Sequence, residues 1–355
     1  MSKFYPVKIA KINKETADSV SIAFNIDPNH KDVFQYTPGQ YIVLKANING
    51  EECRRSYSIC SSKNELLTVA IKKVENGKMS TFINDKLKEG DQIEIQPPQG
   101  NFQLQDIAPS KTRKFVAFAA GSGITPILSM IKELSLNEKG SEFLLFYGNK
   151  TTSDVMFHEE LNSISNNSIK VKYLYSRQNS KNKLYNGRID ESKAKELLKS
   201  EMSYLNSDAF YLCGPEEMIF STKKVLESFG VDNSKIKFEL FTTPVLDIDG
   251  IKKETNVESS DFDGESKVTV IYDDEEVEFF LQKNGDTILD AAMDNDLDVP
   301  FSCKGAVCCT CRAKVKVGKV SMDANYALSD QEVEDGYILT CQSHPNSEKV
   351  IIDFD

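Results

Sequence analysis

Long hydrophobic runs are missing from this chain of 355 residues. No stretch approaches the ~20 consecutive apolar residues that cross a bilayer, and residues 1–10 lack a basic-then-apolar signal pattern. Histidine is scarce, and His30, His158 and His344 do not have metal-ligand spacing. We therefore expect a cytoplasmic protein that has no membrane segment and keeps its thiols reduced.

An excess of positive charge is also missing, since the net charge is −11. No basic stripe is present to neutralise phosphates, which argues against a nucleic-acid partner. The charge is uneven: residues 267–355 hold 18 acidic against 8 basic residues, whereas residues 1–242 hold 29 against 33. This asymmetry is consistent with electrostatic docking of the acidic part, internally or on a partner, and equally with a solvated acidic face.

The chain is too long for one ordinary domain, and its pattern changes along its length. Residues 1–106 alternate short β-prone runs with turn residues, which predicts a small antiparallel β-barrel. Residues 107–242 alternate apolar runs with helical segments, which predicts a doubly wound parallel α/β domain. Residues 243–266 are acidic and rich in serine and predict a flexible linker. Residues 267–355 predict an α+β module.

Four cysteines of this last module carry the strongest signal. Cys303, Cys308 and Cys311 follow a Cys-x4-Cys-x2-Cys pattern, and 29 residues separate Cys311 from the fourth cysteine, Cys341. This is the spacing with which plant-type ferredoxins hold a [2Fe–2S] cluster. The alternative is a structural zinc site, which usually has two short cysteine knuckles. We interpret Cys309 as a small filler and not as a ligand.

Two strings in the first domain have the residue types of a flavin site. At the end of a predicted strand, the string 54–58 reads Arg-Arg-Ser-Tyr-Ser, which offers a cation for a pyrophosphate, a ring and a hydroxyl. The string 77–80 reads Gly-Lys-Met-Ser at a predicted helix start, where anions bind readily. Together they indicate a flavin nucleotide; an ordinary strand and helix start are the alternative.

Three loops of the second domain follow predicted strands and could face a nucleotide. Residues 120–126 read Ala-Gly-Ser-Gly-Ile-Thr-Pro and open a helix, although the third small residue of the Rossmann pattern is absent. Residues 213–215 read Cys-Gly-Pro. Ser176 and Arg177, with Lys183, Tyr185 and Arg188, could hold the extra phosphate of NADPH. A tight turn, a helix cap and a solvated basic loop are the alternatives.

The order of these motifs resembles a known family. Residues 1–242 resemble the ferredoxin–NADP reductase superfamily, and residues 267–355 resemble a plant-type ferredoxin, which implies a β-grasp fold. A reductase followed by a ferredoxin is the order found in reductase components of bacterial oxygenases. The cysteine loop and the Phe-Glu-Leu-Phe string at 238–241 look most like the reductase subunits (PaaE) of phenylacetyl-CoA epoxidases. Those subunits usually have a glycine at the position that Ala306 occupies here.

The resemblance implies a role for each matching residue. FAD would be bound by Arg55, Tyr57, Ser58, Gly77, Met79 and Ser80. The nicotinamide nucleotide would be bound by Gly121, Gly123, Thr125, Pro126, Ser176, Arg177, Cys213, Gly214 and Pro215. As catalytic residues, Ser58 would bond near flavin N5, Glu239 would sit close to the flavin edge, and Cys213 would lie beside the nicotinamide. Phe241 takes the place of a terminal tyrosine. The cluster would be held by Cys303, Cys308, Cys311 and Cys341.

These roles imply an NADPH-dependent reductase, with NADH as the less favoured donor. Electrons would pass through FAD and the [2Fe–2S] cluster to a protein acceptor, the di-iron phenylacetyl-CoA epoxidase of phenylacetate catabolism. The alternatives are a reductase for another Rieske or di-iron oxygenase, a non-enzymatic iron–sulfur sensor, and a zinc-stapled binding module.

Overall fold

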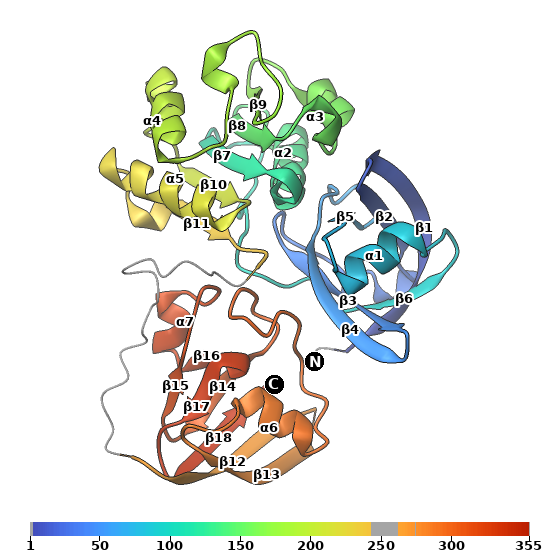
Figure 1. The fold of residues 1–355 in the computed structure, drawn as a ribbon, viewed down its shortest axis with the longest axis vertical. Helices are drawn as coiled ribbons and strands as arrows, with labels where there is room; N and C mark the ends of the chain where they lie inside the picture. The colour runs from blue at the N-terminus through green and yellow to red at the C-terminus, as the bar shows by residue number, and fades with distance from the viewer. Residues whose placement is uncertain (1–2, 243–261, 274, 355) are drawn as a thin grey trace.

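The computed structural model describes residues 3–242, 262–273 and 275–354. Three large sheets each form a lobe, with the nucleotide lobe at the top of Figure 1, the barrel lobe at the right of the figure and the ferredoxin lobe below. This arrangement confirms the predicted multidomain fold class. Most of the predicted linker, residues 243–261, lies outside the described residues.

The barrel lobe is an antiparallel sheet in the order β4-β3-β6-β1-β2-β5. Its edge strands meet through an isolated bridge between Ile59 and Val69. Alternate strand residues, among them Ile22, Ile42 and Leu44, point into the shared core, as a period of two requires. Its elements are β1 (Tyr5–Thr16), β2 (Ser19–Asn25), β3 (Tyr41–Ile48), β4 (Glu51–Ser58), β5 (Thr68–Lys72), α1 (Lys78–Asp85) and β6 (Gln92–Ile95).

The nucleotide lobe is a parallel sheet in the order β11-β10-β7-β8-β9. One face of β7, with Phe115 and Ala117, packs with α2 and α3, and the other face, with Val116 and Phe118, packs with α4 and α5. Apolar runs buried on both faces are typical of such sheets. The elements are β7 (Lys114–Ala120), α2 (Ile124–Asn137), β8 (Glu142–Asn149), α3 (His158–Ile164), β9 (Ile169–Tyr175), α4 (Glu191–Ser200), β10 (Ala209–Cys213), α5 (Glu216–Ser228) and β11 (Ile236–Glu239).

The ferredoxin lobe is a mixed sheet in the order β13-β12-β18-β14-β16, with β15 and β17 paired beside it. The last strand, β18, runs parallel to β12, while the other pairs are antiparallel. The elements are β12 (Glu265–Tyr272), β13 (Glu275–Gln282), α6 (Ile288–Asp294), β14 (Arg312–Val317), β15 (Val320–Met322), α7 (Asp330–Glu334), β16 (Tyr337–Leu339), β17 (Ser343–Pro345) and β18 (Lys349–Asp353). Strand β12 therefore begins inside the range predicted as linker.

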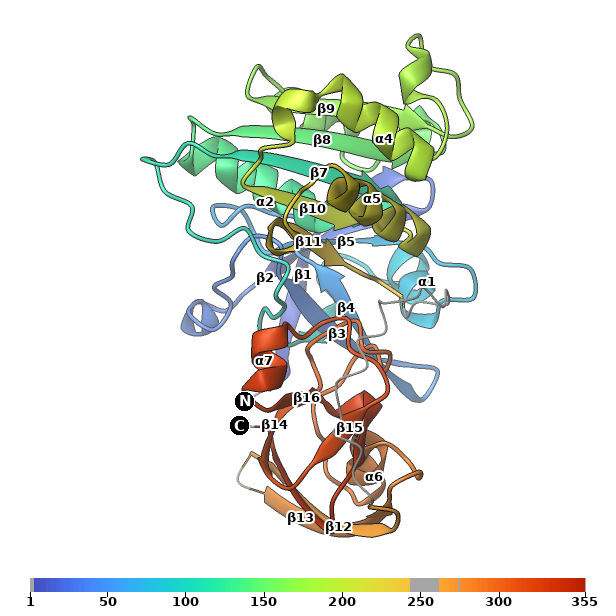
Figure 2. The same cartoon turned by 90° about the vertical axis from the view of Figure 1, so that its left-hand side faces the viewer.

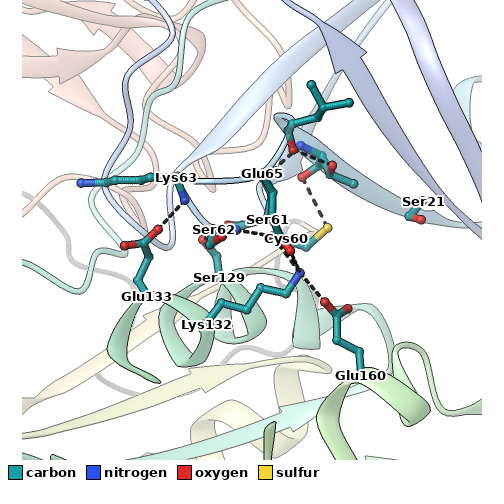
Figure 3. A network of polar contacts seen from close by, with 12 residues as sticks. Ser21, Cys60, Ser61, Ser62, Lys63, Glu65, Ser129, Lys132, Glu133 and Glu160 are labelled. Carbon is teal, nitrogen blue, oxygen red and sulfur yellow. Dashed lines mark hydrogen bonds and ion pairs between the residues drawn. The ribbon is translucent and has the colours of Figure 1, made fainter. Parts of the chain in front are cut away.

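A polar network joins the barrel lobe to the nucleotide lobe (Figure 3). Lys132 on α2 forms ion pairs with Glu65 of the barrel lobe at 3.1 Å and with Glu160 of α3 at 2.6 Å. The Ser129 hydroxyl donates to the Ser61 carbonyl at 2.7 Å, and the buried Glu133 carboxylate accepts from the Lys63 amide. These contacts hold α2 of the nucleotide lobe against the barrel lobe.

The ferredoxin lobe contacts both other lobes, and Figure 2 shows it below β3, β4 and β11. Cys308 packs with Tyr41 and Val43 of β3, and Val307 packs on the core of the nucleotide lobe. Among the residues with described positions, no helix is long and apolar enough to span a bilayer.

Candidate redox site

The barrel and nucleotide lobes meet at a hydrogen bond between two predicted site residues. The Ser58 hydroxyl at the end of β4 donates to the Glu239 carboxylate at the end of β11, at 2.9 Å. The side-chain carboxyl group of Glu239 is buried, and this burial raises its pKa to about 8. The hydrogen bond from Ser58 lowers the pKa, and the nearby Cys308 raises it further. Glu239 can therefore hold a proton at neutral pH beside the end of β4, the flavin strand, which carries the predicted flavin residues Arg55, Tyr57 and Ser58.

Strand β4 presents different side chains on its two faces. Arg55 and Tyr57 alternate with Arg54 and Ser56, so the two pairs point in opposite directions. Arg55 is exposed and donates to the carbonyl of Arg54 at 2.6 Å. Burial raises the pKa of Tyr57, whose ring packs on the barrel core. An exposed guanidinium beside a tyrosine ring suits a flavin diphosphate and its ring system.

The start of α1 is the second part of the predicted flavin site. Gly77 caps the helix without a side-chain hydrogen bond, and α1 packs against β3, β4 and β5. The Ser80 hydroxyl accepts from the Val74 amide at 3.1 Å and so closes the loop before the helix. The Met79 side chain is buried in the barrel core, so it can offer a ligand only its backbone.

A pocket of about 560 Å³ opens at the carboxyl ends of the parallel strands. That edge is where nucleotides bind in doubly wound sheets. Six of the predicted residues line it: Gly121, Ser176, Arg177, Gly214, Pro215 and Phe241. Phe241 is 42 % exposed and stands at the pocket wall. Of the three predicted phosphate helpers, Arg188 lines the pocket, whereas Lys183 and Tyr185 do not.

Four other residues that were predicted to bind the nucleotide lie behind the pocket and do not line it. A Cβ on Gly123 would lie 2.1 Å from the carbonyl oxygen of Cys213, so glycine is needed for close packing of two loops and not for approach of a ligand. Thr125 donates to the Ser122 carbonyl at 3.0 Å, and Pro126 is buried in the first turn of α2. Cys213 is fully buried, which raises the pKa of its thiol well above the usual range.

Sequence reasoning missed Asn149, which lines the pocket, and Tyr147, which supports the glycine loop. Asn149 at the end of β8 lines the pocket, and within the described part of the chain its buried amide atoms have no hydrogen-bond partner. The Tyr147 hydroxyl donates to the Gly121 carbonyl at 3.0 Å and steadies the glycine loop. A polar residue two positions after the buried run 143–147, with Gly148 between them, was the available signal for Asn149. An unsatisfied amide at this edge fits a polar ligand such as a dinucleotide.

The four predicted cluster ligands come together in one cradle. The Sγ atoms of Cys303 and Cys308 lie 3.2 Å apart, and Cys341 contacts both Cys303 and Cys311. Pairing of the thiols suits two irons, each held by two thiolates. No group of three or more His, Cys, Asp or Glu side chains in residues 3–242, 262–273 and 275–354 is arranged to hold one metal ion.

The loop backbone fits a cluster as well. The Gly305 amide donates to the Cys303 sulfur at 3.3 Å, and inward N–H groups of this kind stabilise a cluster. Lys304 and Ala306 have φ values of 51° and 63°, and for alanine this left-handed geometry costs about 1 kcal/mol. Cys309 points elsewhere: its sulfur donates to the Ala327 carbonyl at 3.4 Å, outside the cradle.

Comparison with known families matches each lobe. The family "Oxidoreductase FAD-binding domain" matches residues 6–104, and "Oxidoreductase NAD-binding domain" matches residues 118–224. The family "2Fe-2S iron-sulfur cluster binding domain" matches residues 270–346. The fold and the site thus define a NAD(P)H-dependent flavin oxidoreductase that carries its own ferredoxin domain.

Curated relatives match nearly the whole chain. A 1,2-phenylacetyl-CoA epoxidase subunit of Escherichia coli is 37% identical over 100% of this chain and 99% of its own. The "3-ketosteroid-9-alpha-monooxygenase, ferredoxin reductase component" of Rhodococcus rhodochrous is 29% identical over 98% and 95%. The chain belongs to this family of electron-transfer reductases, which join FAD-binding, NAD-binding and 2Fe-2S domains in one polypeptide.

Solved structures agree on the fold. Phthalate dioxygenase reductase has a TM-score of 0.58 at 23% identity, and the match covers 99% of this chain and 98% of that one. A self-sufficient cytochrome P450 monooxygenase has a TM-score of 0.72 at 18% identity, over 98% of this chain and 41% of that one.

Proposed function

We propose that this chain takes electrons from NADPH and passes them through FAD and a [2Fe–2S] cluster to the oxygenase component of a phenylacetyl-CoA epoxidase. The observation that carries the proposal is the meeting of three sites at Glu239. Its carboxylate accepts from Ser58 on the flavin strand, Glu239 is the register partner of Cys213 on the neighbouring strand β10, and Glu239 and Cys308 line one cavity. A relay needs its donor and acceptor sites this close together.

In this proposal Arg55 and the start of α1 bind the FAD diphosphate, and Tyr57 packs on the ring system. Ser58 and Glu239 together hold a proton beside the ring, because the raised pKa of Glu239 lets it exchange one near neutral pH. The bound flavin supplies the conversion of a hydride, a two-electron donor, into single electrons. Cys213 packs at the same place as a neutral thiol.

The preference for NADPH rests on the charge of the nucleotide pocket. Ser176 and Arg177 follow β9, and Arg188 lies in the same pocket. A guanidinium pair suits a phosphate on the adenosine ribose, because arginine binds phosphate with two parallel hydrogen bonds. Asp190 and Glu217 lie in the same pocket and set a limit on how much negative charge it accepts.

The acceptor is inferred from the relative named as part of a phenylacetyl-CoA epoxidase, which matches the whole chain at 37% identity. Reductase components of 3-ketosteroid and glycine betaine monooxygenases match at 29% and 27%, so another oxygenase is the second candidate. The test is reconstitution of the purified chain with NADPH, phenylacetyl-CoA and the epoxidase oxygenase component. Epoxide formation supports the proposal, and turnover only with a different oxygenase would replace it by the second candidate.

A further inference from the structure

Arg54 is a buried arginine that the flavin site does not use. It precedes the flavin-motif Arg55 but points to the opposite face of β4. Its side chain is 4 % exposed. A charge that is so deeply buried is stable only when charged or polar groups on the same face of β4 pair with it.

Its partners come mainly from the ferredoxin lobe. Arg54 Nη2 pairs with the Asp298 carboxylate at 2.6 Å, and Nη1 donates to the Val299 carbonyl at 3.4 Å. The guanidinium also lies over the Phe301 ring, 4.5 Å from its centroid. Within the barrel lobe it pairs with Glu52 at 2.7 Å and lies 5.1 Å from the Phe4 ring centroid.

Other contacts continue along the same face of the β3–β4 pair toward the cluster. The Ser56 hydroxyl donates to Ser302 at 2.8 Å, one residue before the first cluster cysteine. The Tyr41 hydroxyl accepts from the Cys309 amide at 3.0 Å, inside the cysteine loop. Tyr41 is the strand partner of Ser58, so this face ends at the flavin-site hydroxyl.

We propose that Arg54 is a positioning residue that docks the ferredoxin lobe on the reverse face of the flavin strand and thereby sets the rate of internal electron transfer. One strand then serves both sites, with Arg55 and Tyr57 on one face and Arg54 and Ser56 on the other. The kinetic part rests on the proposed function, in which the flavin site loads the cluster; the docking part does not.

Arginine suits this place for reasons that lysine does not share. Its planar fork pairs with a carboxylate and a carbonyl at once, and its flat face packs on aromatic rings. Asp298 is 77 % exposed, so the pair can open to water from the ferredoxin side. The acidic ferredoxin lobe is thereby held by a cation of the barrel lobe at its cluster loop.

The test uses the full chain loaded with FAD and iron–sulfur cluster, as wild type and as Arg54→Gln and Asp298→Lys variants. Amide hydrogen exchange of residues 298–310, without nucleotide, reports docking. Stopped-flow absorbance after mixing with NADPH reports flavin reduction and cluster reduction separately. Lys267→Gln is the matched control, because Lys267 pairs with Glu278 at 2.8 Å between β12 and β13 of the same lobe.

In both docking variants we expect faster exchange in 298–310 and cluster reduction about tenfold slower or more, in proportion to the lost docked population. Flavin reduction stays at the wild-type rate, and the control variant matches wild type.

Wild-type exchange together with wild-type cluster reduction in Asp298→Lys would overturn the proposal. Asp298 lies outside the barrel, so this variant decides the matter even if Arg54→Gln fails to fold. A wild-type cluster that NADPH never reduces would contradict the proposed function, while the exchange result still judges the docking.

Discussion

Ser58 and Glu239 lie in different lobes, 181 positions apart in the chain, and are joined by a 2.9 Å hydrogen bond. The bond ties the end of the barrel's flavin strand to the last strand of the nucleotide sheet. Because the carboxyl end of Glu239 is buried there, its folded-state pKa rises from 4.5 to about 8.

This raised pKa predicts a pH dependence of stability. The folded chain holds the Glu239 proton more tightly than the unfolded chain, so the stabilisation is complete below pH 4.5 and is lost as the pH rises through about 8. The full effect is on the order of a few kcal/mol. Glu239→Gln should flatten the decline of the thermal midpoint of the flavin-free chain between pH 6 and 9. An unchanged slope in the variant would show that Glu239 is not the group that titrates.

Gly123 and Gly121 should respond differently to alanine. Gly123→Ala places a methyl group against the Cys213 backbone, and we expect a loss of stability of about 1–3 kcal/mol or more. At Gly121 no atom lies within 4 Å of the added Cβ, but its φ of 55° disfavours alanine and its loop lines the pocket. Gly121→Ala should thus mainly weaken nucleotide binding. Thermal midpoints and NADPH titrations of both variants test the contrast, which fails if Gly123→Ala is as stable as wild type.

Arg177 is expected to select the phosphorylated nucleotide. Arg177→Gln removes a charged hydrogen bond worth about 1.5–3 kcal/mol, which corresponds to a roughly tenfold to hundredfold rise in the KM for NADPH. The KM for NADH should change little. Lys183→Gln serves as the control, since Lys183 lies on the following turn but does not line the pocket. An equal rise in the KM for NADPH and the KM for NADH would show that Arg177 does not discriminate between the two nucleotides.

The two neighbouring cysteines of the loop should differ sharply. Cys308→Ser removes a thiol of the cradle and should abolish cluster assembly, because four thiolates are needed. Cys309→Ser should keep the cluster, since that sulfur lies outside the cradle. Iron and acid-labile sulfide in the purified variants give the answer, and a cluster that survives in Cys308→Ser would refute the assigned ligand set.

Much of the architecture could be predicted from local patterns. The run 115–119 alternates between two helical layers, so its continuous apolar character indicated a doubly buried strand. Cysteine spacing located the cradle because three ligands lie in one loop. Strand β18 was not predicted: it pairs in parallel with β12 across more than 80 residues, and no local signal encodes that pairing. The docking of Arg54 was missed for the same reason, because Asp298 is 244 positions away.

The most direct test of the electron path is an anaerobic titration of the purified, iron-replete chain with NADPH, followed by its visible spectrum. We expect the flavin and cluster bands both to bleach and the protein to contain acid-labile sulfide. A protein without acid-labile sulfide, or one that stays fully oxidised in the presence of excess NADPH and NADH, would contradict it.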